Sequence, residues 1–298
     1  MRVTFNGTLR DTYEGIQSAA DRMLEFQRQV STGIRVAHPS DDPGAASTAI
    51  SEKASSASYE QYSQAGDSAE SRLTVADTIL SDIVDKLGAA RTVILSVQGS
   101  NTTDAQRLAG LQELQSLRDA IFEDLNTTFH GTYVFGGAAG TVKPYTKDGS
   151  GVVQPYAAST REVTIEVDRG RSVTIAFDGS AIAQGSALSD VFAVFDSAIT
   201  ATSAADATAL GAASTDLQDA FDRATRAQTL VGTDLRAIAD HQTQLAEAGR
   251  ASKARISKLE DANMAQAISG LQQAETAYQA SLGAAARTTR NSLFDYLN

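Results

Sequence analysis

The sequence contains no cysteine and no tryptophan, and it has few aromatic residues of any kind. Without cysteine the chain forms no disulfide and has no thiolate chemistry, although this absence does not identify a compartment. Aromatic residues make up only 6% of the chain, whereas hydrophobic residues make up 42%, and alanine is frequent throughout. This composition suits long, closely packed helices better than a thick globular core.

Clusters of positive charge are also missing. The formal net charge is −11 at pH 7, and no basic patch interrupts the excess of acidic residues. We therefore expect neither nucleic acid nor an anionic membrane as a partner. The first residues lack the apolar core of a secretory signal, and polar residues interrupt every hydrophobic segment, so no transmembrane helix is expected.

A polar stretch over residues 29–43 separates two long helical patterns. Gly33 stands where the first pattern ends, and glycine accepts the left-handed backbone that closes a helix. Pro39 keeps the residue before it out of the helical region, so the middle of the stretch is expected to be extended. Asp42 and Pro43 then predict a new helix, with a capping carboxylate before a proline at the first helical position. The sequence thus predicts an extended connector between two layers of helices.

Apolar and small residues recur at heptad spacing along the chain, as in helices that pair with one another. The first seam is formed by Phe5, Leu9, Thr12, Ile16, Ala19, Met23, Phe26 and Val30. A second helix, over about 44–97, carries Leu73, Ala76, Leu80, Ile83, Leu87, Ala90, Ile94 and Val97. The longest seam is formed by Phe221, Ala224, Gln228, Val231, Leu235, Ile238, Gln242, Leu245, Gly249, Ser252, Ile256 and Leu259. The last is formed by Met264, Ile268, Leu271, Glu275, Tyr278, Leu282 and Ala285. One amphipathic helix cannot bury such a stripe alone, so each of these helices needs a partner.

The periodicity changes between the helical regions. Apolar residues alternate along residues 163–167 and 173–177, and Arg169 and Gly170 between them indicate a hairpin turn. We expect about four strands in a small inserted β domain over residues 143–182, enough for independent stability.

The order of helices, strands and helices predicts a mainly α fold, a long antiparallel helical bundle or coiled coil with a small inserted β domain. Because the two ends of the chain mirror each other, the N- and C-terminal helices should pair. The expected domains are a terminal coiled-coil layer with its connector (1–43 and 263–298), a central long-helix domain with a short hairpin (44–142 and 183–262), and the inserted β domain (143–182).

No set of residues predicts catalysis or metal binding. His38, Asp41 and Asp42 could be imagined as metal ligands, but a turn before proline and a helix cap explain these positions better. The glycines within residues 136–140 fit neither a P-loop nor a dinucleotide-binding motif. We expect no enzyme, no cofactor and no metal site; an enzyme or metal-binding protein built on the β domain is the alternative from another class.

Several segments are similar to those of a known family. Residues 29–43, with their ending Pro-Ser-Asp-Asp-Pro, resemble the N-terminal signature of the flagellin superfamily. Residues 129–137 are similar to its Gly-x-Tyr-x-Phe turn, and the hairpin after Arg161 fits its inserted domain. The ending Ser-Leu-Phe-Asp-Tyr-Leu at residues 292–297 resembles the branch of this superfamily found at the hook–filament junction, since filament flagellins typically end differently.

This resemblance implies a structural axial protein of the bacterial flagellum, secreted through the type III export channel without a cleaved signal. The partners that it implies are the first hook-associated protein, flagellin, an export chaperone and further copies in a ring. A filament-forming flagellin is the alternative within the same class.

The terminal seams are thin and rich in alanine, so neighbouring copies would complete their burial. The last residues add large apolar side chains that a monomer has little means to cover. The residues expected to serve assembly are Phe5, Leu9, Ile16, Met23, Phe26, Val30, Gly33, Arg35, Asp41, Asp42, Ile268, Leu271, Tyr278, Leu282, Leu293, Phe294, Tyr296 and Leu297.

Overall fold

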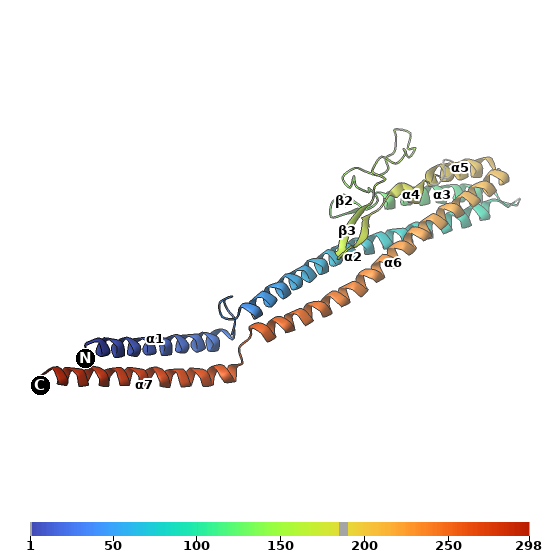
Figure 1. The fold of residues 1–298 in the computed structure, drawn as a ribbon. Coiled ribbons are helices and arrows are strands. Elements are labelled where there is room, and N and C mark those ends of the chain that lie inside the picture. Colours follow the sequence, from blue (N-terminus) through green and yellow to red (C-terminus); the bar gives the residue numbers. More distant parts are fainter. Residues whose placement is uncertain (1, 100, 185–189, 298) are drawn as a thin grey trace. The chain divides into compact units, whose positions relative to one another are not determined.

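A computed structural model describes residues 2–99, 101–184 and 190–297 of the chain, without the side chains of residues 2–6, 8–9 and 288–297. As the sequence predicts, the fold is mainly helical, and two short hairpins are inserted between the helices (Figure 1). The helices are α1 (Arg2–Thr32), α2 (Pro43–Val97), α3 (Asp104–Leu125), α4 (Gly179–Ala183), α5 (Val191–Ala204), α6 (Ala207–Glu260) and α7 (Met264–Leu297). The strands are β1 (Thr128–Phe129), β2 (Thr132–Tyr133), β3 (Val163–Asp168) and β4 (Arg171–Ala176).

The chain divides into two compact units, one formed by residues 1–58 with 247–298 and the other by residues 59–246. Both divisions fall inside the long helices α2 and α6. In the first unit α1 and α7 lie antiparallel, which confirms the predicted pairing of the terminal helices (Figure 1). The three domains predicted from the sequence differ from these two units, because they keep α2 and α6 nearly whole. The three-domain division stays a prediction.

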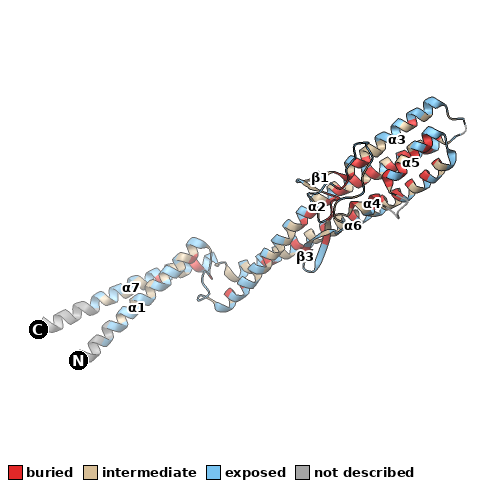
Figure 2. Ribbon diagram, turned by 90° about the horizontal axis from the view of Figure 1, so that it is seen from above, coloured by how far each residue is buried: buried red, intermediate tan, exposed pale blue. Residues whose placement is uncertain are grey.

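The second unit is built on the paired seams of α2 and α6. Every predicted seam position of α2 from Leu73 to Val97 is buried. In α6, Ala224, Val231 and Ile238 are buried, and the seam positions between them are half-buried. The heptad prediction for these two helices is therefore confirmed. Figure 2 shows the buried residues concentrated where α2, α3, α5 and α6 come together.

Helices α3 and α5 complete this core. Thr103 begins α3 with a capping box, in which its backbone N–H donates to Gln106 Oε1 at 2.8 Å and its hydroxyl accepts from the Gln106 N–H at 3.3 Å. This exchange satisfies amide groups that the first turn of a helix leaves without partners. Phe122 of α3 meets Phe192 of α5 edge to face, with ring centroids 6.3 Å apart.

The β region is smaller than predicted. The expectation of about four strands over residues 143–182 is wrong, because that stretch holds the two-stranded sheet β3–β4 and, beside it, isolated bridges such as the one between Lys147 and Val153. Around residue 152 the backbone forms a tight turn, in which the Asp148 carboxylate accepts the N–H groups of Ser150 and Val152 and the Asp148 N–H donates to the carbonyl of Val152. The predicted hairpin turn is confirmed: Asp168 pairs with Arg171 across it, and Gly170 has φ +75°.

The hairpin β3–β4 does not close a core of its own. Val167 and Val173 are buried in the same hydrophobic cluster as α2, α3, α5 and α6. Tyr145, which is fully buried, joins this cluster and donates from its hydroxyl to the carbonyl of Gly179 at 3.2 Å. Burial raises the pKa of Tyr145, so this phenol stays protonated and remains a donor at any ordinary pH.

Ile238→Ala should lower the free energy of unfolding by about 2–5 kcal/mol, because Ile238 is fully buried in the α2–α6 seam. Leu230→Ala in the same helix is the matched control, since Leu230 is 68% exposed and its truncation leaves no cavity. Urea unfolding followed by circular dichroism measures both. Equal destabilisation by the two substitutions would show that the seam has been assigned to the wrong face.

Removal of residues 146–182 should leave the long helices folded but less stable. The helices keep their own seam, whereas the core loses Val167 and Val173. Each kcal/mol lost should lower the melting temperature by about 2–4 °C in a chain of this size. Loss of most helical circular dichroism would mean that the predicted domain boundary is wrong.

Candidate assembly site at the terminal helices and connector

The connector, residues 33–42, lies against the short turn between α6 and α7. Arg35 N–H donates to the carbonyl of Glu260 at 2.6 Å, and the Ala262 N–H donates to the carbonyl of Gly33 at 2.8 Å. Gly33 has φ +73°, the left-handed conformation expected of a residue that ends a helix. The backbone groups that an extended connector leaves unpaired thus find partners in the same chain, at residues far away in sequence.

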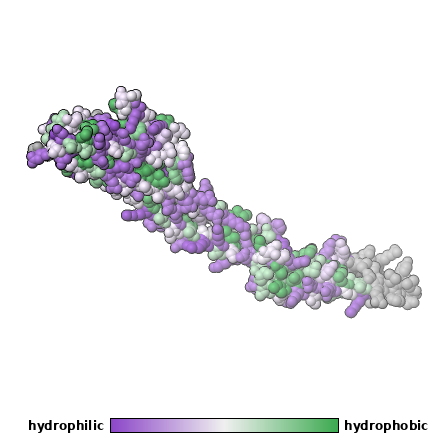
Figure 3. All heavy atoms as spheres, turned by 180° about the vertical axis from the view of Figure 1, so that it is seen from behind, coloured by the Kyte–Doolittle hydropathy of each residue, from purple (hydrophilic) through white to green (hydrophobic). Residues whose placement is uncertain are grey.

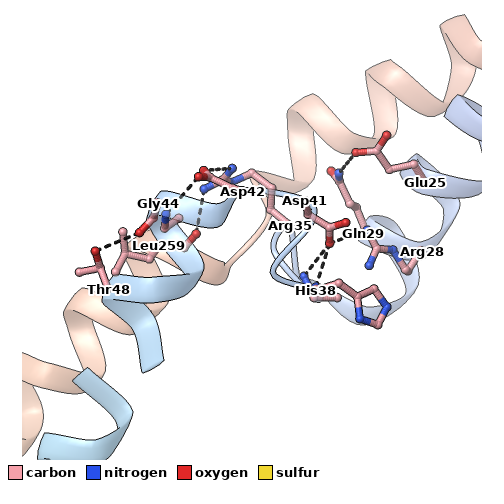
Figure 4. Close-up of polar contacts among 12 residues, drawn as sticks. Glu25, Arg28, Gln29, Arg35, His38, Asp41, Asp42, Gly44, Thr48 and Leu259 are labelled. Carbon is pink, nitrogen blue, oxygen red and sulfur yellow. Dashed lines mark hydrogen bonds and ion pairs between the residues drawn. The ribbon is translucent and has the colours of Figure 1, made fainter. Parts of the chain in front are cut away.

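Asp41 folds the connector back on itself. Its Oδ2 accepts the N–H groups of Ala37 and His38, both at 3.0 Å, and pairs with Arg28 Nη2 at 3.1 Å (Figure 4). The backbone N–H of His38, followed by the Arg28 side chain, lowers the pKa of Asp41. The sequence analysis did not predict a role for Arg28, because nothing in the spacing of residues 28 and 41 indicates that they meet.

Asp42 and Arg35 join the start of α2 to the end of α6. Asp42 Oδ1 accepts the Ala45 N–H at 3.0 Å, which confirms the predicted helix cap. Arg35 pairs with the other oxygen of Asp42 at 3.2 Å and donates to the carbonyl of Leu259 at 2.9 Å (Figure 4). The Ala45 N–H and then Arg35 lower the pKa of Asp42.

A second group of polar contacts joins α2 to α6 beyond the connector. Arg255 forms a bidentate ion pair with Glu52, at 2.7 and 2.9 Å, and the buried Ser252 hydroxyl donates to the same carboxylate at 2.7 Å. Arg255 and then Ser252 lower the pKa of Glu52. Lys53 Nζ lies 2.6 Å from Glu260 Oε1. Paired groups of this kind fix the register of two helices whose seam here is made of small residues.

On α1, the predicted seam residues whose side chains are described are partly covered. Ile16, Met23, Phe26 and Val30 are all half-buried. The side chains of Phe5 and Leu9 lie outside the described residues, as do those of Leu293, Phe294, Tyr296 and Leu297 in α7.

On α7, the face that meets α1 is only partly the one that the heptad predicts. Leu271 and Tyr278 are half-buried, but Ile268 and Leu282 are 46% and 43% exposed. The buried positions are instead Ala267 and Ala274.

The reason is the close approach of the two helices at Gly270. A Cβ atom at Gly270 would lie 2.5 Å from the Phe26 ring, so the ring occupies the space of the missing side chain. Small residues therefore form the contact, and the larger apolar residues lie at its edge. On the face shown in Figure 3, apolar residues gather on this helix pair. Gly270 is the signal of this close approach in the sequence, but a count of apolar heptad positions does not include glycine.

The charged groups of the connector serve structural hydrogen bonds. No group of three or more His, Asp or Glu side chains that could hold a metal ion occurs in the part of the chain that the structure describes. The carboxylates of the connector are occupied by amide groups and arginines. No helix among residues 2–99, 101–184 and 190–297 is long and apolar enough to cross a membrane.

Comparison with known proteins gives consistent matches. Residues 3–139 match the model of the bacterial flagellin N-terminal helical region. Flagellar hook-associated protein 3 of Escherichia coli (strain K12) is 27% identical over 317 residues, covering 99% of each chain. FlgL of Bacillus cereus has a solved structure with the same fold, at 21% identity and a TM-score of 0.60, covering 70% of this chain and 99% of that one. The flagellar junction protein FlgL from Legionella pneumophila has 13% identity and a TM-score of 0.60, with 72% and 100% covered.

Gly270→Ala should weaken the α1–α7 pair, because the added methyl group meets the Phe26 ring. Gly283→Ala is the matched control in the same helix, since nothing lies within 4 Å of a Cβ atom at Gly283. Alanine stabilises a helix by roughly 0.5–1 kcal/mol relative to glycine, so the control should gain stability while Gly270→Ala does not. Amide hydrogen exchange of α1 measures the difference. Equal protection in both variants would rule out the close contact.

Proposed function

We propose that this chain, which belongs to the flagellin superfamily as a flagellar hook-associated protein 3, is the structural adaptor between the hook and the filament of the bacterial flagellum. The observation that carries the proposal is the similarity to such a protein along essentially the whole chain, together with an architecture of paired terminal helices and a hydrogen-bonded connector. It is a structural protein of the flagellar axis and not an enzyme.

The terminal helix pair is the part of the chain that we assign to assembly. Its apolar residues remain uncovered: Tyr13 and Leu24 of α1 are 62% and 57% exposed, and Ile268 and Leu282 of α7 are nearly half exposed. Exposed apolar side chains of this size are normally covered by a partner. We assign this face to contacts with neighbouring copies in a ring, and with the first hook-associated protein and flagellin on either side.

The connector serves this role by holding the pair to the long helices. Arg35, Asp41 and Asp42 make charged hydrogen bonds that join α1, α2 and α6. Charge-assisted hydrogen bonds are stronger and more directional than neutral ones, so they keep the connector in one conformation under load.

The C-terminal residues are assigned to the same surface from the sequence alone. Leu293, Phe294, Tyr296 and Leu297 place four large apolar groups within the last residues of the chain. Burial of each is worth roughly 1.5–3 kcal/mol. We infer that neighbouring subunits cover them after assembly, and that an export chaperone covers them before it.

Deletion of the gene should leave normal hooks without filaments, with flagellin released unpolymerised into the medium. The full-length chain should restore filaments, whereas a chain truncated after Asn291 should not, because it lacks the apolar end. The melting temperature of the truncated chain should stay that of the full chain, since α2 and α6 are unaffected. Electron microscopy of the cells and calorimetry of the purified proteins measure these outcomes.

Two results would count against the proposal. Growth of long filaments by the purified chain alone would identify it as a filament flagellin. If cells that carry only the truncated chain have filaments, the C-terminal residues are not part of the assembly surface. The adaptor role would still stand.

A further inference from the structure

The hairpin β3–β4 is fastened to both long helices of the second unit. At its open end, Arg72 of α2 donates to the carbonyl of Ile175 through Nε and to the carbonyl of Tyr133 through Nη2 at 3.1 Å. At its turn, Asp168 and Arg171 both contact the imidazole of His241 on α6. The hairpin therefore forms a strap, residues 163–176, from α2 to α6.

Beneath the strap the apolar seam of α2 and α6 is interrupted by polar and small residues. Gly66 of α2 faces Gln242 of α6, whose side-chain amide would lie 3.3 Å from a Cβ atom at Gly66. Gln242 also donates to Asp67 Oδ1 at 2.7 Å. Glycine and glutamine bury less apolar surface than the leucine and isoleucine found elsewhere in this seam, so the strap adds to the attachment between the helices here.

The neighbours of His241 require one form of its ring. Arg171 Nη1 lies 2.5 Å from His241 Nε2, and a guanidinium only donates hydrogen bonds, so Nε2 must carry a lone pair. The proton of the neutral ring is then on Nδ1, which lies 3.4 Å from Asp168 Oδ2. The side chain of His241 is only 14% exposed, so water cannot readily replace these partners.

We propose that His241 is a pH-sensitive latch, which holds the strap to α6 while the imidazole is neutral and loosens it when the imidazole is protonated. Imidazole is the side chain that normally changes charge between pH 5 and 8. Protonation places a hydrogen on Nε2, which removes the acceptor for Arg171 and sets two cations face to face. Nothing in this step depends on the adaptor role.

Charged groups from β3, β4 and α6 surround the latch. Asp168 on β3 makes the longer contact with the ring, and this contact is not a hydrogen bond in the structure. Arg171 on β4 makes the shorter contact, and it needs the lone pair on Nε2 that protonation removes. On α6, Asp234 interacts with Arg171 and offers it another partner.

Two further carboxylates of this region already have hydrogen-bond partners. Glu166 of β3 is engaged by the Tyr62 hydroxyl at 3.5 Å and by the Gly170 N–H at 3.0 Å, and Asp67 is engaged by Gln242. Acidification should therefore expel Arg171 from His241 and free the turn of the strap.

Amide hydrogen exchange of the full chain at about pH 7.5 and 5.5 tests the latch, with each rate corrected for the intrinsic effect of pH. Exchange within residues 163–176 should rise by about tenfold at the lower pH, the effect of losing one hydrogen bond to a charged group. In His241→Gln the rise should vanish, because an amide can accept from Arg171 and does not titrate. His38→Gln, at an exposed histidine of the connector, should keep the full rise.

A second variant and a direct measurement complete the test. Arg171→Gln keeps the imidazole but removes the facing cation, so its strap should also lose the response to pH. Nitrogen-15 NMR of the histidine rings at about pH 7.5 should find the proton of His241 on Nδ1. A proton on Nε2, or an unchanged exchange rate in the native protein, or the same rise in His241→Gln, would overturn the proposal.

Discussion

The structure depends on contact between helices that are far apart in the sequence. Each long helix carries its apolar residues as one narrow stripe, and such a helix is not stable in water by itself. Burial of the stripes of α2 and α6 against each other, and of α1 against α7, brings the two ends of the chain together. The shortage of aromatic residues follows the same constraint, because small side chains allow helices to lie close. Gly270 under the Phe26 ring is the clearest case.

Polar groups define the arrangement wherever the apolar stripe becomes thin. In the connector, Asp41 and Asp42 each accept backbone N–H groups and an arginine, so a segment without regular structure has its hydrogen bonds satisfied. Between α2 and α6, where the seam consists of small residues, the bidentate ion pair of Glu52 and Arg255 joins the two helices. Hydrogen bonds are directional, and for this reason they fix register where apolar contact alone would allow the helices to slide.

The β region shows that a hairpin can belong to a helical core. Val167 and Val173 belong to the same hydrophobic cluster as residues of α2, α3, α5 and α6. Arg72 holds both hairpins, since its guanidinium donates to the Thr132 hydroxyl at 2.8 Å as well as to the carbonyls of Tyr133 and Ile175. A two-stranded sheet is marginal in water, and attachment to helices gives it the stability that extra strands would otherwise provide.

The sequence by itself determined the long helices, two of their ends and the pairing of the terminal helices. Heptad spacing predicted the buried positions of α2 and α6, because an alternating step of three and four residues places side chains on one helical face whatever lies opposite. Gly33 and Asp42 marked helix ends through local backbone chemistry, which needs no distant residue. Only the tertiary structure decided which face of α7 meets α1, because a glycine at position 270 brings small residues inward and leaves Ile268 and Leu282 at the edge. It also decided that Arg28 meets Asp41 and that His241 meets Arg171, since pairs of charges form where the packed backbone brings them together, and spacing along the chain does not contain that information.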